Sequence, residues 1–508
     1  LRGASPEAES EFVLRATINE VALDELRWRG GESKRFEIAV PPGVVTEGTN
    51  TLRLEHATDE YSGVLLDSFM CTYPRASVTE SGRLSGTWSG TGPALVTGSS
   101  GPVVDTTQVP AVWLSEVEAT EGGVRFWAES GHRYEVGVLK PEVRRAGRLR
   151  LKRPQKGADY LLIGPREFLA ETEPLITLRR SQGLTTRSIS VEDVWAEFGH
   201  GEVRPEAIRE FLSYAYHEWS SPQVRYVVLL GDGTYDYKDY LGYGVPNVIP
   251  PLLARTSYLW TASDPSYGWV NGADELPDIA IGRLPVETVE ETRALVSKLV
   301  AFGVGEGLRG PVVLVADDAD HGGDFKANAE DLATSVLWGE ELQKLYLGEL
   351  GVGATREGIV HAFDGGARLM SYVGHGGTRL WADEQIFDAP AVQKLSPQSN
   401  QPVVLTINCY TGSFHLPYPD YDSLSEELVK VEDRGAVAAI SPSGLSLNTP
   451  AHYLHRAYLE ELTSGRHERL GDAIRAAQEA YAATGALPEL LTIYHLFGDP
   501  AMKLKGCE

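Results

Sequence analysis

A histidine and a cysteine each follow a short apolar segment, and glycine lies close to both. His375 comes after residues 368–373 and Gly374, and Cys409 comes after residues 401–408. Apolar runs of this length that end in turn residues are typical of buried strands in a parallel sheet. If the two strands are neighbours, their carboxyl ends lie about 5 Å apart, within the reach of an imidazole and a thiol. The spacing therefore predicts that His375 and Cys409 meet.

Such a pair can attack a carbonyl carbon. A free thiol has a pKa of about 8.5 and is mostly protonated at neutral pH, so a neighbouring imidazole must take its proton. The developing oxyanion needs N–H donors, and we assign the main-chain N–H groups of Gly376 and Cys409 to that role, because glycines allow backbone geometries that side chains forbid. Asp317 is the first candidate to orient the imidazole, and Asp318 and Asp320 come next.

A structural role for these two residues stays open at this point. A lone histidine or cysteine is usually structural, and buried cysteine is common. Against this, both residues would end parallel strands of one sheet, where the sites of α/β proteins form.

Length and composition limit the class of protein. A chain of 508 residues exceeds one hydrophobic core, so two or three domains are expected. No apolar run reaches about 18 residues, so no membrane span is expected. The formal net charge of −25 argues against a nucleic-acid partner and against anionic lipid. The composition does not define an oligomeric state.

The number of cysteines and the first residue of the sequence limit the disulfides and the processing that we expect. The three cysteines, Cys71, Cys409 and Cys507, are too few for a disulfide framework, and their odd number leaves at least one thiol free. The sequence starts at Leu1 without a signal segment, so we expect a mature or trimmed fragment.

Residues 1–143 are predicted to form an all-β, jelly-roll-like sandwich. Apolar and polar residues alternate in segments such as 11–18, 35–40 and 123–128, with Gly/Pro turns between them. We interpret this domain as structural or inhibitory, with carbohydrate or partner binding as the alternative.

Residues 144–157 are predicted to form a basic linker. Seven of the thirteen residues 144–156 are Lys or Arg and none is acidic. A solvated linker is the first interpretation, and a proteolytic processing site is the alternative.

The rest of the chain alternates strands with helices, which predicts an α/β fold with doubly wound, mostly parallel sheets in two subdomains, 158–303 and 304–508. The acidic loop 317–324 has the carboxylate density to hold calcium, although the EF-hand spacing is absent. Predicted elements include strands at 160–163 and 225–230, an edge strand within 277–285, helices at 167–182, 205–216, 288–302, 325–345 and 355–363, and a closing turn and strand at 497–504.

Two of these segments resemble the catalytic histidine and cysteine segments of the gingipain family of cysteine peptidases. They run from Tyr372 to Trp381 and from Val404 to Phe414. The resemblance covers roughly residues 158–505 in family order. It also includes residues 263–268, 281–283, 435–440 and 497–500.

The resemblance implies a caspase-like fold and a secreted or surface-bound bacterial endopeptidase that acts on proteins or peptides. It gives His375 as the base, Cys409 as the nucleophile, and the N–H groups of Gly376 and Cys409 as the oxyanion hole. No cofactor is expected for catalysis, and bound calcium would be structural. A looser likeness links the preceding β-domain to the N-terminal modules of exported bacterial proteins with this peptidase domain.

The same resemblance makes predictions about the substrate pocket. Asp324 falls near the acidic residue at the base of the family's primary pocket, which implies a preference for a basic P1 side chain. The aromatic residue that covers that pocket aligns with Asn448, preceded by Leu447, so this chain departs from the pattern there. Trp381 is also assigned to substrate binding.

Other functions compete with a peptidase. A transpeptidase of the same family, like the sortase of type IX secretion, would resolve the thioester with an amine instead of water. A non-catalytic surface binding or adhesion protein is the alternative from another class, and the intact His375 and Cys409 argue against it. A peptidase that prefers basic residues could also cut its own 144–156 segment, as a zymogen does.

Overall fold

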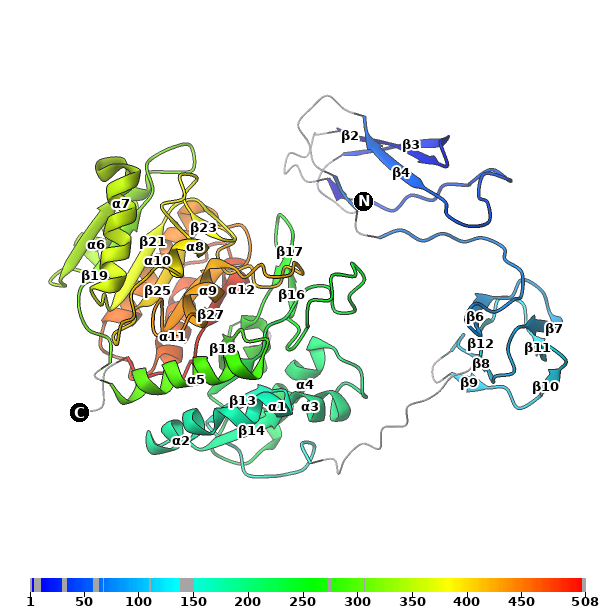
Figure 1. Cartoon of the computed structure of the whole chain (residues 1–508), viewed down its shortest axis with the longest axis horizontal. Helices are drawn as coiled ribbons and strands as arrows, with labels where there is room; N and C mark the ends of the chain where they lie inside the picture. The colour runs from blue at the N-terminus through cyan, green and yellow to red at the C-terminus, as the bar shows by residue number, and fades with distance from the viewer. Residues whose placement is uncertain are drawn as a thin grey trace. The chain divides into compact units, whose positions relative to one another are not determined.

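The computed structural model describes residues 2–3, 11–29, 34–57, 64–66, 68–108, 111–137, 150–272, 274, 276–305 and 307–504. The chain divides into two compact units, Leu1–Arg145 and Ala146–Glu508 (Figure 1). Linker residues 144–149 and Cys507 lie outside the described ranges, so the interpretation of those residues stays a prediction. Within the described ranges no helix has the length and apolar character to cross a membrane.

In the part of the first unit that the structure describes, the regular elements are all strands, as predicted, but they do not form one sandwich over residues 1–143. Residues 11–56 hold a three-stranded sheet, in the order β3–β2–β4, with a small core of its own around Phe12 and Trp28. The predicted strand at 35–40 is absent there: Phe36 and Ile38 pack against that core, but this segment has no strand to pair with. The strands are β1 (Arg2–Gly3), β2 (Glu11–Ile18), β3 (Val21–Arg29), β4 (Leu52–His56) and β5 (Val64–Leu65).

Two further sheets lie between residues 83 and 137. Their orders are β6–β12–β8–β9 and β10–β11–β7, and side chains from both, such as Tyr134 and Phe126, enter one core. This shared core is the sandwich part of the unit. The strands are β6 (Arg83–Thr87), β7 (Gly92–Thr97), β8 (Val103–Asp105), β9 (Val112–Trp113), β10 (Val117–Thr120), β11 (Gly123–Ala128) and β12 (Arg133–Gly137).

The second unit is an α/β structure around a single ten-stranded sheet. The strand order is β14–β13–β15–β18–β27–β26–β25–β21–β19–β20, and β27 runs antiparallel to β26. The predicted subdomains, 158–303 and 304–508, therefore share one sheet. Its strands are β13 (Tyr160–Gly164), β14 (Thr186–Ser190), β15 (Tyr226–Leu230), β18 (Ala280–Leu284), β19 (Val312–Ala316), β20 (Leu342–Tyr346), β21 (Leu369–Val373), β25 (Val403–Ile407), β26 (Ala438–Pro442) and β27 (Tyr494–Phe497).

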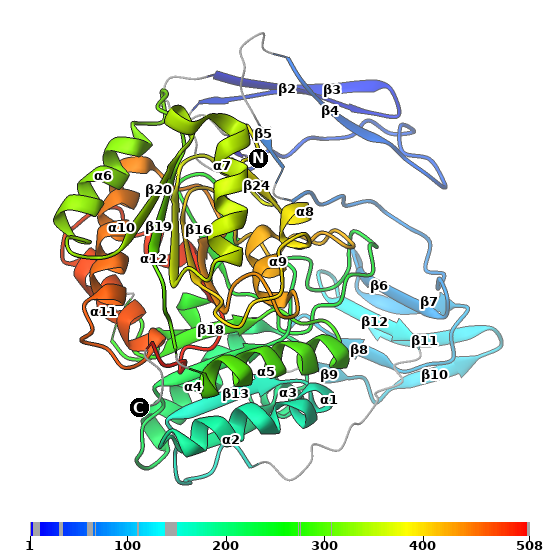
Figure 2. The same cartoon turned by 60° about the vertical axis from the view of Figure 1, so that its left-hand side comes forward.

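Helices cover both faces of this sheet, so almost every residue of its inner strands is buried, whereas the edge strands β14 and β20 are partly exposed. Val312 and Leu314 of β19 enter one core, whereas Val313 and Val315 enter the core on the opposite face. Figure 2 shows α6, α10 and α11 on one side of the sheet and α7, α8 and α9 on the other. The helices are α1 (Arg166–Leu169), α2 (Glu173–Ser181), α3 (Val191–Glu197), α4 (Pro205–Glu218), α5 (Val289–Val304), α6 (Phe325–Ser335), α7 (Leu347–Asp364), α8 (Ala389–Val392), α9 (Leu424–Lys430), α10 (Asn448–Thr463), α11 (Leu470–Ala482) and α12 (Leu490–Ile493).

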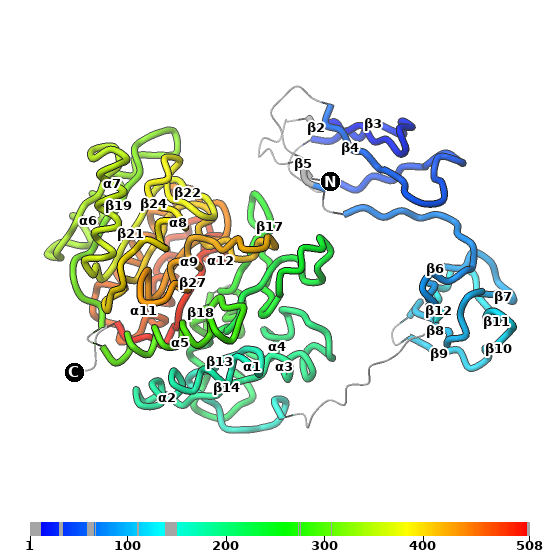
Figure 3. The backbone as a smooth tube through the Cα atoms, viewed as in Figure 1, coloured from blue at the N-terminus to red at the C-terminus, as the bar shows by residue number. Residues whose placement is uncertain are grey.

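Several predicted elements differ from the structure. The predicted helix 325–345 ends at Ser335, and its last residues belong to strand β20, which pairs with β19. The predicted edge strand within 277–285 is β18, which lies inside the sheet between β15 and β27. The closing strand is β27, which ends at Phe497 instead of following it. It lies in the middle of the sheet (Figure 3). Two short pieces complete the unit: hairpin β16 (Leu253–Arg255) with β17 (Trp260–Ala262), and sheet β22 (Gly376–Gly377), β23 (Leu380–Trp381), β24 (Phe387–Asp388).

Candidate active site

The strands before the histidine and the cysteine are neighbours, as predicted. β21 pairs with β25 in parallel, with Leu369 opposite Val403 and Val373 opposite Ile407. The N–H of Gly374 then donates to the carbonyl of Ile407, at 3.2 Å, so the pairing continues to the start of both turns. His375 and Cys409 therefore leave the same edge of the sheet from adjacent strands.

The imidazole of His375 lies against an aspartate and a phenylalanine. Its Nε2 is 3.0 Å from Oδ2 of Asp320. The ring of Phe325, the first residue of α6, meets it edge-on, with 5.3 Å between the ring centroids. Burial opposes a charge on Asp320, yet the Gly322 N–H and the His375 ring hold the pKa of this carboxyl below its usual value. The imidazole is thus oriented by an ionised carboxylate.

Asp317, the first predicted partner of the imidazole, contacts the main chain of His375 instead. Its Oδ2 accepts the His375 N–H at 2.9 Å and the Tyr372 hydroxyl at 3.3 Å, and its Oδ1 accepts the Asp318 N–H at 3.0 Å. Burial raises the pKa of Asp317 to about 6, and these N–H donors limit the rise. Asp317 therefore fixes the turn that carries the histidine, and Asp320 contacts the ring.

The thiol of Cys409 lies in a half-buried position next to a loop that sequence reasoning did not single out. Its Sγ accepts the Ser446 N–H at 3.5 Å and is 3.7 Å from the Ser446 carbonyl oxygen. The Ser446 hydroxyl in turn lies 2.9 Å from the hydroxyl of Tyr494 in β27. Burial raises the pKa of the Cys409 thiol, and the Ser446 N–H opposes this only in part. The sequence could have indicated Ser446, because this residue lies in the loop after β26, and β26 runs parallel to β25 and ends at the same edge of the sheet.

The backbone turns sharply immediately after the cysteine. Tyr410 has a φ of 64°, in the left-handed region that residues other than glycine seldom occupy. Its N–H donates to the carbonyl of Gly444 at 3.1 Å, which holds the turn in place. Strain of this kind is common at active sites.

Gly374 and Gly376 of the histidine turn are required because their neighbours leave no room for a Cβ, and not because of an unusual backbone angle. Gly374, Gly376 and Gly377 do not have left-handed φ angles. A Cβ on Gly376 would lie 2.2 Å from Nδ2 of Asn408 and 2.8 Å from the carbonyl oxygen of Cys409. A Cβ on Gly374 would lie 2.4 Å from Cβ of Asp317. Glycine lets the histidine turn pack directly on its neighbours, including the main chain of the cysteine.

The predicted pocket residues fall into two groups. Asp324 is exposed and caps α6 by accepting the Ala327 N–H at 2.9 Å. Asn448, the first residue of α10, packs against this loop and α6: its Oδ1 accepts from Asn328 of α6 at 2.8 Å, and a Cβ on Gly323 would lie 1.9 Å from its Nδ2. Leu447 precedes it and is exposed.

Trp381 does not belong with the other predicted pocket residues. Its side chain is fully buried and stacks on Tyr372, with 4.7 Å between ring centroids. A side chain without exposed surface cannot contact a substrate, so its assignment to substrate binding is wrong. Through its stack on Tyr372, the tryptophan packs against β21.

Three carboxylates could hold a metal ion. Asp317, Asp318 and Glu384 each place an oxygen within 4.8 Å of the others. Glu384 also helps to raise the pKa of Asp317, after burial, so a cation there would relieve a repulsion. Calcium takes about six to eight oxygen ligands, so these residues would supply only part of its shell.

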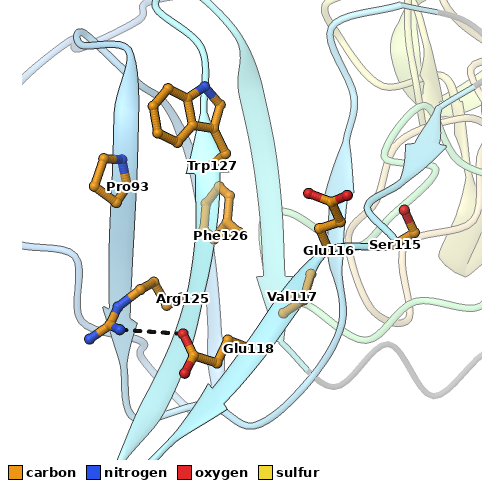
Figure 4. Close-up of a pocket in the computed structure, with 8 residues that line it drawn as sticks. All are labelled: Pro93, Ser115, Glu116, Val117, Glu118, Arg125, Phe126 and Trp127. Carbon is orange, nitrogen blue, oxygen red and sulfur yellow. Dashed lines mark hydrogen bonds and ion pairs between the residues drawn. The ribbon is translucent and has the colours of Figure 1, made fainter.

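A shallow depression of about 520 Å³ lies elsewhere, on the outer face of the β10–β11–β7 sheet. Trp127 and the ion pair between Arg125 and Glu118 line it, together with Glu116 (Figure 4). It contains no cysteine or histidine, so the candidate chemistry belongs to the second unit.

Comparison with known proteins agrees with this geometry. A sequence model described as peptidase family C25 matches residues 153–505. Gingipain R2 of Porphyromonas gingivalis is 22% identical over 366 residues, which are 68% of this chain and 46% of that protein. Gingipain R1 of Porphyromonas gingivalis is 22% identical over 394 residues, 73% of this chain and 36% of that protein. The chain thus spans less than half the length of these relatives.

Solved structures share the fold of the second unit. The crystal structure of the Arg-specific cysteine proteinase gingipain R matches with a TM-score of 0.57 at 20% sequence identity. The match covers 68% of this chain and 78% of that chain.

Proposed function

The chain belongs to peptidase family C25, and from that premise we propose that it is a cysteine endopeptidase with Cys409 as its nucleophile. One observation carries the proposal: the pairing of β21 with β25 brings the turns that hold His375 and Cys409 to one edge of the sheet. The contact of Gly376 with the main chain of Cys409 supports the same arrangement.

Proton transfer from Cys409 to His375 opens the proposed reaction. Nε2 of His375 lies 3.0 Å from Oδ2 of Asp320, so in the proposed tautomer it carries the ring proton and Nδ1 accepts the thiol proton. Asp320 then stabilises the imidazolium that forms. Without this base the thiol would stay protonated at neutral pH, because burial raises its pKa.

The thiolate sulfur then attacks the carbonyl carbon of the peptide bond, and the carbonyl oxygen becomes an oxyanion. The N–H groups of Gly376 and Cys409 are the proposed donors to it. When the C–N bond breaks, the imidazolium gives its proton to the leaving amine. A water molecule deprotonated by the same imidazole hydrolyses the thioester and restores the thiol.

We propose a preference for a basic P1 side chain, because the loop beside His375 is acidic. Asp320 and Asp324 both lie on it, and the cap on α6 uses one carboxylate oxygen of Asp324. A solved structure of the same fold is described as an Arg-specific proteinase. Peptides with Arg, Lys, Asn or Asp at P1 test the preference, which fails if the two basic substrates are not the best.

Self-processing in the basic linker is part of the proposal, and the contacts of Glu197 limit where it can occur. The buried carboxylate of Glu197 accepts the N–H groups of Arg150, Leu151 and Lys152, at distances from 2.6 to 3.0 Å. A peptidase needs an extended, accessible substrate segment. Cutting within 150–152 would first have to break these hydrogen bonds, so we place the cut before Arg150.

Labelling with a peptidyl acyloxymethyl ketone that has a basic P1 residue tests the nucleophile and the pocket together. We expect the probe to modify Cys409 in the wild type and nothing in Cys409→Ala. Cys71→Ala is the matched control, because it removes an exposed thiol of the first unit and should label like the wild type. Labelling that persists in Cys409→Ala would overturn the proposed function.

The same variants test self-processing. A wild-type preparation should yield a smaller β fragment and a larger catalytic fragment that begins at or before Leu149, directly after a basic residue, and Cys409→Ala should stay intact. An intact wild type that nevertheless cleaves peptides would show that the linker is not its substrate.

A further inference from the structure

The N-terminal turn of α9 joins the histidine turn to the cysteine loop. The N–H of Leu424 donates to the carbonyl of Thr378 at 2.8 Å, and the N–H of Ser425 donates to the carbonyl of Thr411 at 3.1 Å. Thr378 follows His375 in the histidine turn, and Thr411 follows Cys409. The first N–H groups of a helix have no acceptor within the helix, so they are available for such contacts. Two consecutive residues of α9 therefore hold both turns.

The side chain of Ser425 reaches a third segment of the site. It is fully buried, and its hydroxyl donates to the Ser441 hydroxyl at 2.6 Å. Ser441 lies in β26, and the loop after this strand brings Ser446 to the Cys409 sulfur. A buried hydroxyl pair of this kind costs free energy when one partner is lost.

An ion pair fixes the histidine turn to the same helix. Arg379, in the turn between β22 and β23, donates to Glu427 of α9 at 3.1 Å and to the Asp422 carbonyl at 2.5 Å. The two side chains of the pair are 27% and 17% exposed, so solvent screens it only in part. Gln393 also donates to Glu427, at 2.9 Å.

Both ends of α9 are themselves fixed. Ser423 and Glu426 form a capping box at its start, with the Ser423 N–H 2.8 Å from Oε2 of Glu426. At its end, the buried ammonium of Lys298 donates to the carbonyls of Leu428 and Val429, at 3.3 and 3.0 Å. The helix is thus a rigid reference for the segments bonded to it.

We propose that α9 sets the separation of the His375 imidazole from the Cys409 thiol, with Ser425 and the Arg379–Glu427 pair as positioning residues; this rests on the proposed function. In this proposal none of these side chains contacts the substrate. Each acts by holding the main chain of a turn that carries a reacting group. A displacement of about 1 Å between reacting groups costs on the order of 100-fold in rate.

Ser425→Ala and Glu427→Gln test the proposal, because both leave the main-chain bonds of α9 in place. We expect kcat to fall about tenfold in each variant, with KM within about twofold of the wild type. Glu340→Gln is the matched control. It breaks the Arg368–Glu340 pair at the other end of β21, whose side chains are 26% and 30% exposed. It should lose a similar amount of thermal stability and keep its kcat.

A second readout does not need a peptide substrate. Alkylation of Cys409 by iodoacetamide at neutral pH, followed by mass spectrometry of its peptide, reports how well His375 takes the thiol proton. We expect slower alkylation in Ser425→Ala and Glu427→Gln than in the wild type and in Glu340→Gln. Equal alkylation rates and equal kcat in all four folded proteins would overturn the positioning role. A wild type inert to peptides would instead refute the proposed function, and the alkylation rates would still test the role of α9.

Discussion

Asp317 and Asp320 contact different parts of His375. Asp320 is partly exposed and contacts the ring, whereas Asp317 is buried and accepts from the main chain. Asp317 replaces its lost hydration with hydrogen bonds from Tyr372, His375 and Asp318. A change at Asp320 should therefore act on the reaction, and a change at Asp317 should act on the fold.

Asp320→Asn should lower kcat by about 100-fold or more with little change in melting temperature, because an amide cannot stabilise the imidazolium. Asp317→Asn should lose about 1–3 kcal/mol of folding stability, since its amide nitrogen would face an N–H donor. Steady-state kinetics and thermal melts of both variants check this. The reverse pattern, with Asp317→Asn folded and inactive, would restore Asp317 as the partner of the ring.

Asp317 also gives stability a pH dependence. Its pKa is raised to about 6 by burial, above its unfolded value, so the folded chain binds this proton more tightly. Its contribution to stability is therefore greatest below the unfolded pKa and decreases as the pH rises through about 6. Asp317→Asn should remove this decrease from melting temperatures measured between pH 4 and pH 7.

The site could be predicted from sequence to the level of strand ends and no further. His375 and Cys409 stand out because each ends an apolar strand, and strands buried on both faces are easily recognised. Asp317 and Asp320 both follow β19, and only side-chain direction separates them. Trp381 was assigned to substrate binding with the family resemblance, which does not show that its side chain is fully buried.

At the scale of elements, the motifs away from the reacting pair turn out to hold the sheet together. Asp264 and Arg283 form a buried bidentate pair, at 2.6 and 2.8 Å, and Arg283 also donates to the carbonyls of Gly231 and Ile249. Asp499 pairs with Arg179 at 2.8 Å, with both side chains almost fully buried. Asp264, Arg283 and Asp499 are the charged members of the segments 263–268, 281–283 and 497–500.

Breaking the Asp264–Arg283 pair should destabilise the second unit strongly. Asp264→Asn leaves the buried Arg283 charge without its counter-ion, so we expect a loss of about 3–5 kcal/mol. The exposed pair of Arg180 with Glu173 is the control: Glu173→Gln should cost less than about 1 kcal/mol. Urea unfolding of both variants measures the difference, and losses of equal size would contradict it.

The strands that are buried on both faces of the sheet were predicted best. β15, β21 and β25 are buried throughout and were predicted as strands, whereas β20, at the sheet edge, was included in a predicted helix. Leu342 and Leu345 of β20 are three residues apart, a spacing that suits a helix face equally well. Only the pairing with β19 decides between the two, and pairing is a long-range property.

For the whole second unit, the main difference from prediction is one sheet in place of two. β27 joins the halves: it lies between β18 and β26, and its residues come after those of every other strand. Phe497 of β27 is fully buried and packs against Phe414 of the cysteine loop, with 5.8 Å between ring centroids. Local sequence patterns cannot predict which strands such a late strand pairs with.

Removing β27 should therefore abolish the folded second unit. A chain that stops after Ile493 leaves the facing edges of β18 and β26 unpaired, and unpaired edges aggregate. Size-exclusion chromatography and circular dichroism should show an aggregated or unfolded protein. A chain that stops after Leu504 is the control and should stay monodisperse, and a folded product from the shorter chain would refute a central role for β27.

The late position of β27 also sets an order of events during synthesis. His375 and Cys409 are made long before Tyr494, whose hydroxyl supports the Ser446 loop at the sulfur. A ribosome adds about 5–20 residues each second, so several seconds separate the thiol from the strand that completes its surroundings. In that interval the nascent chain carries its nucleophile on an incomplete sheet. The surroundings of the Cys409 thiol are therefore complete only after Tyr494 of β27 has been added.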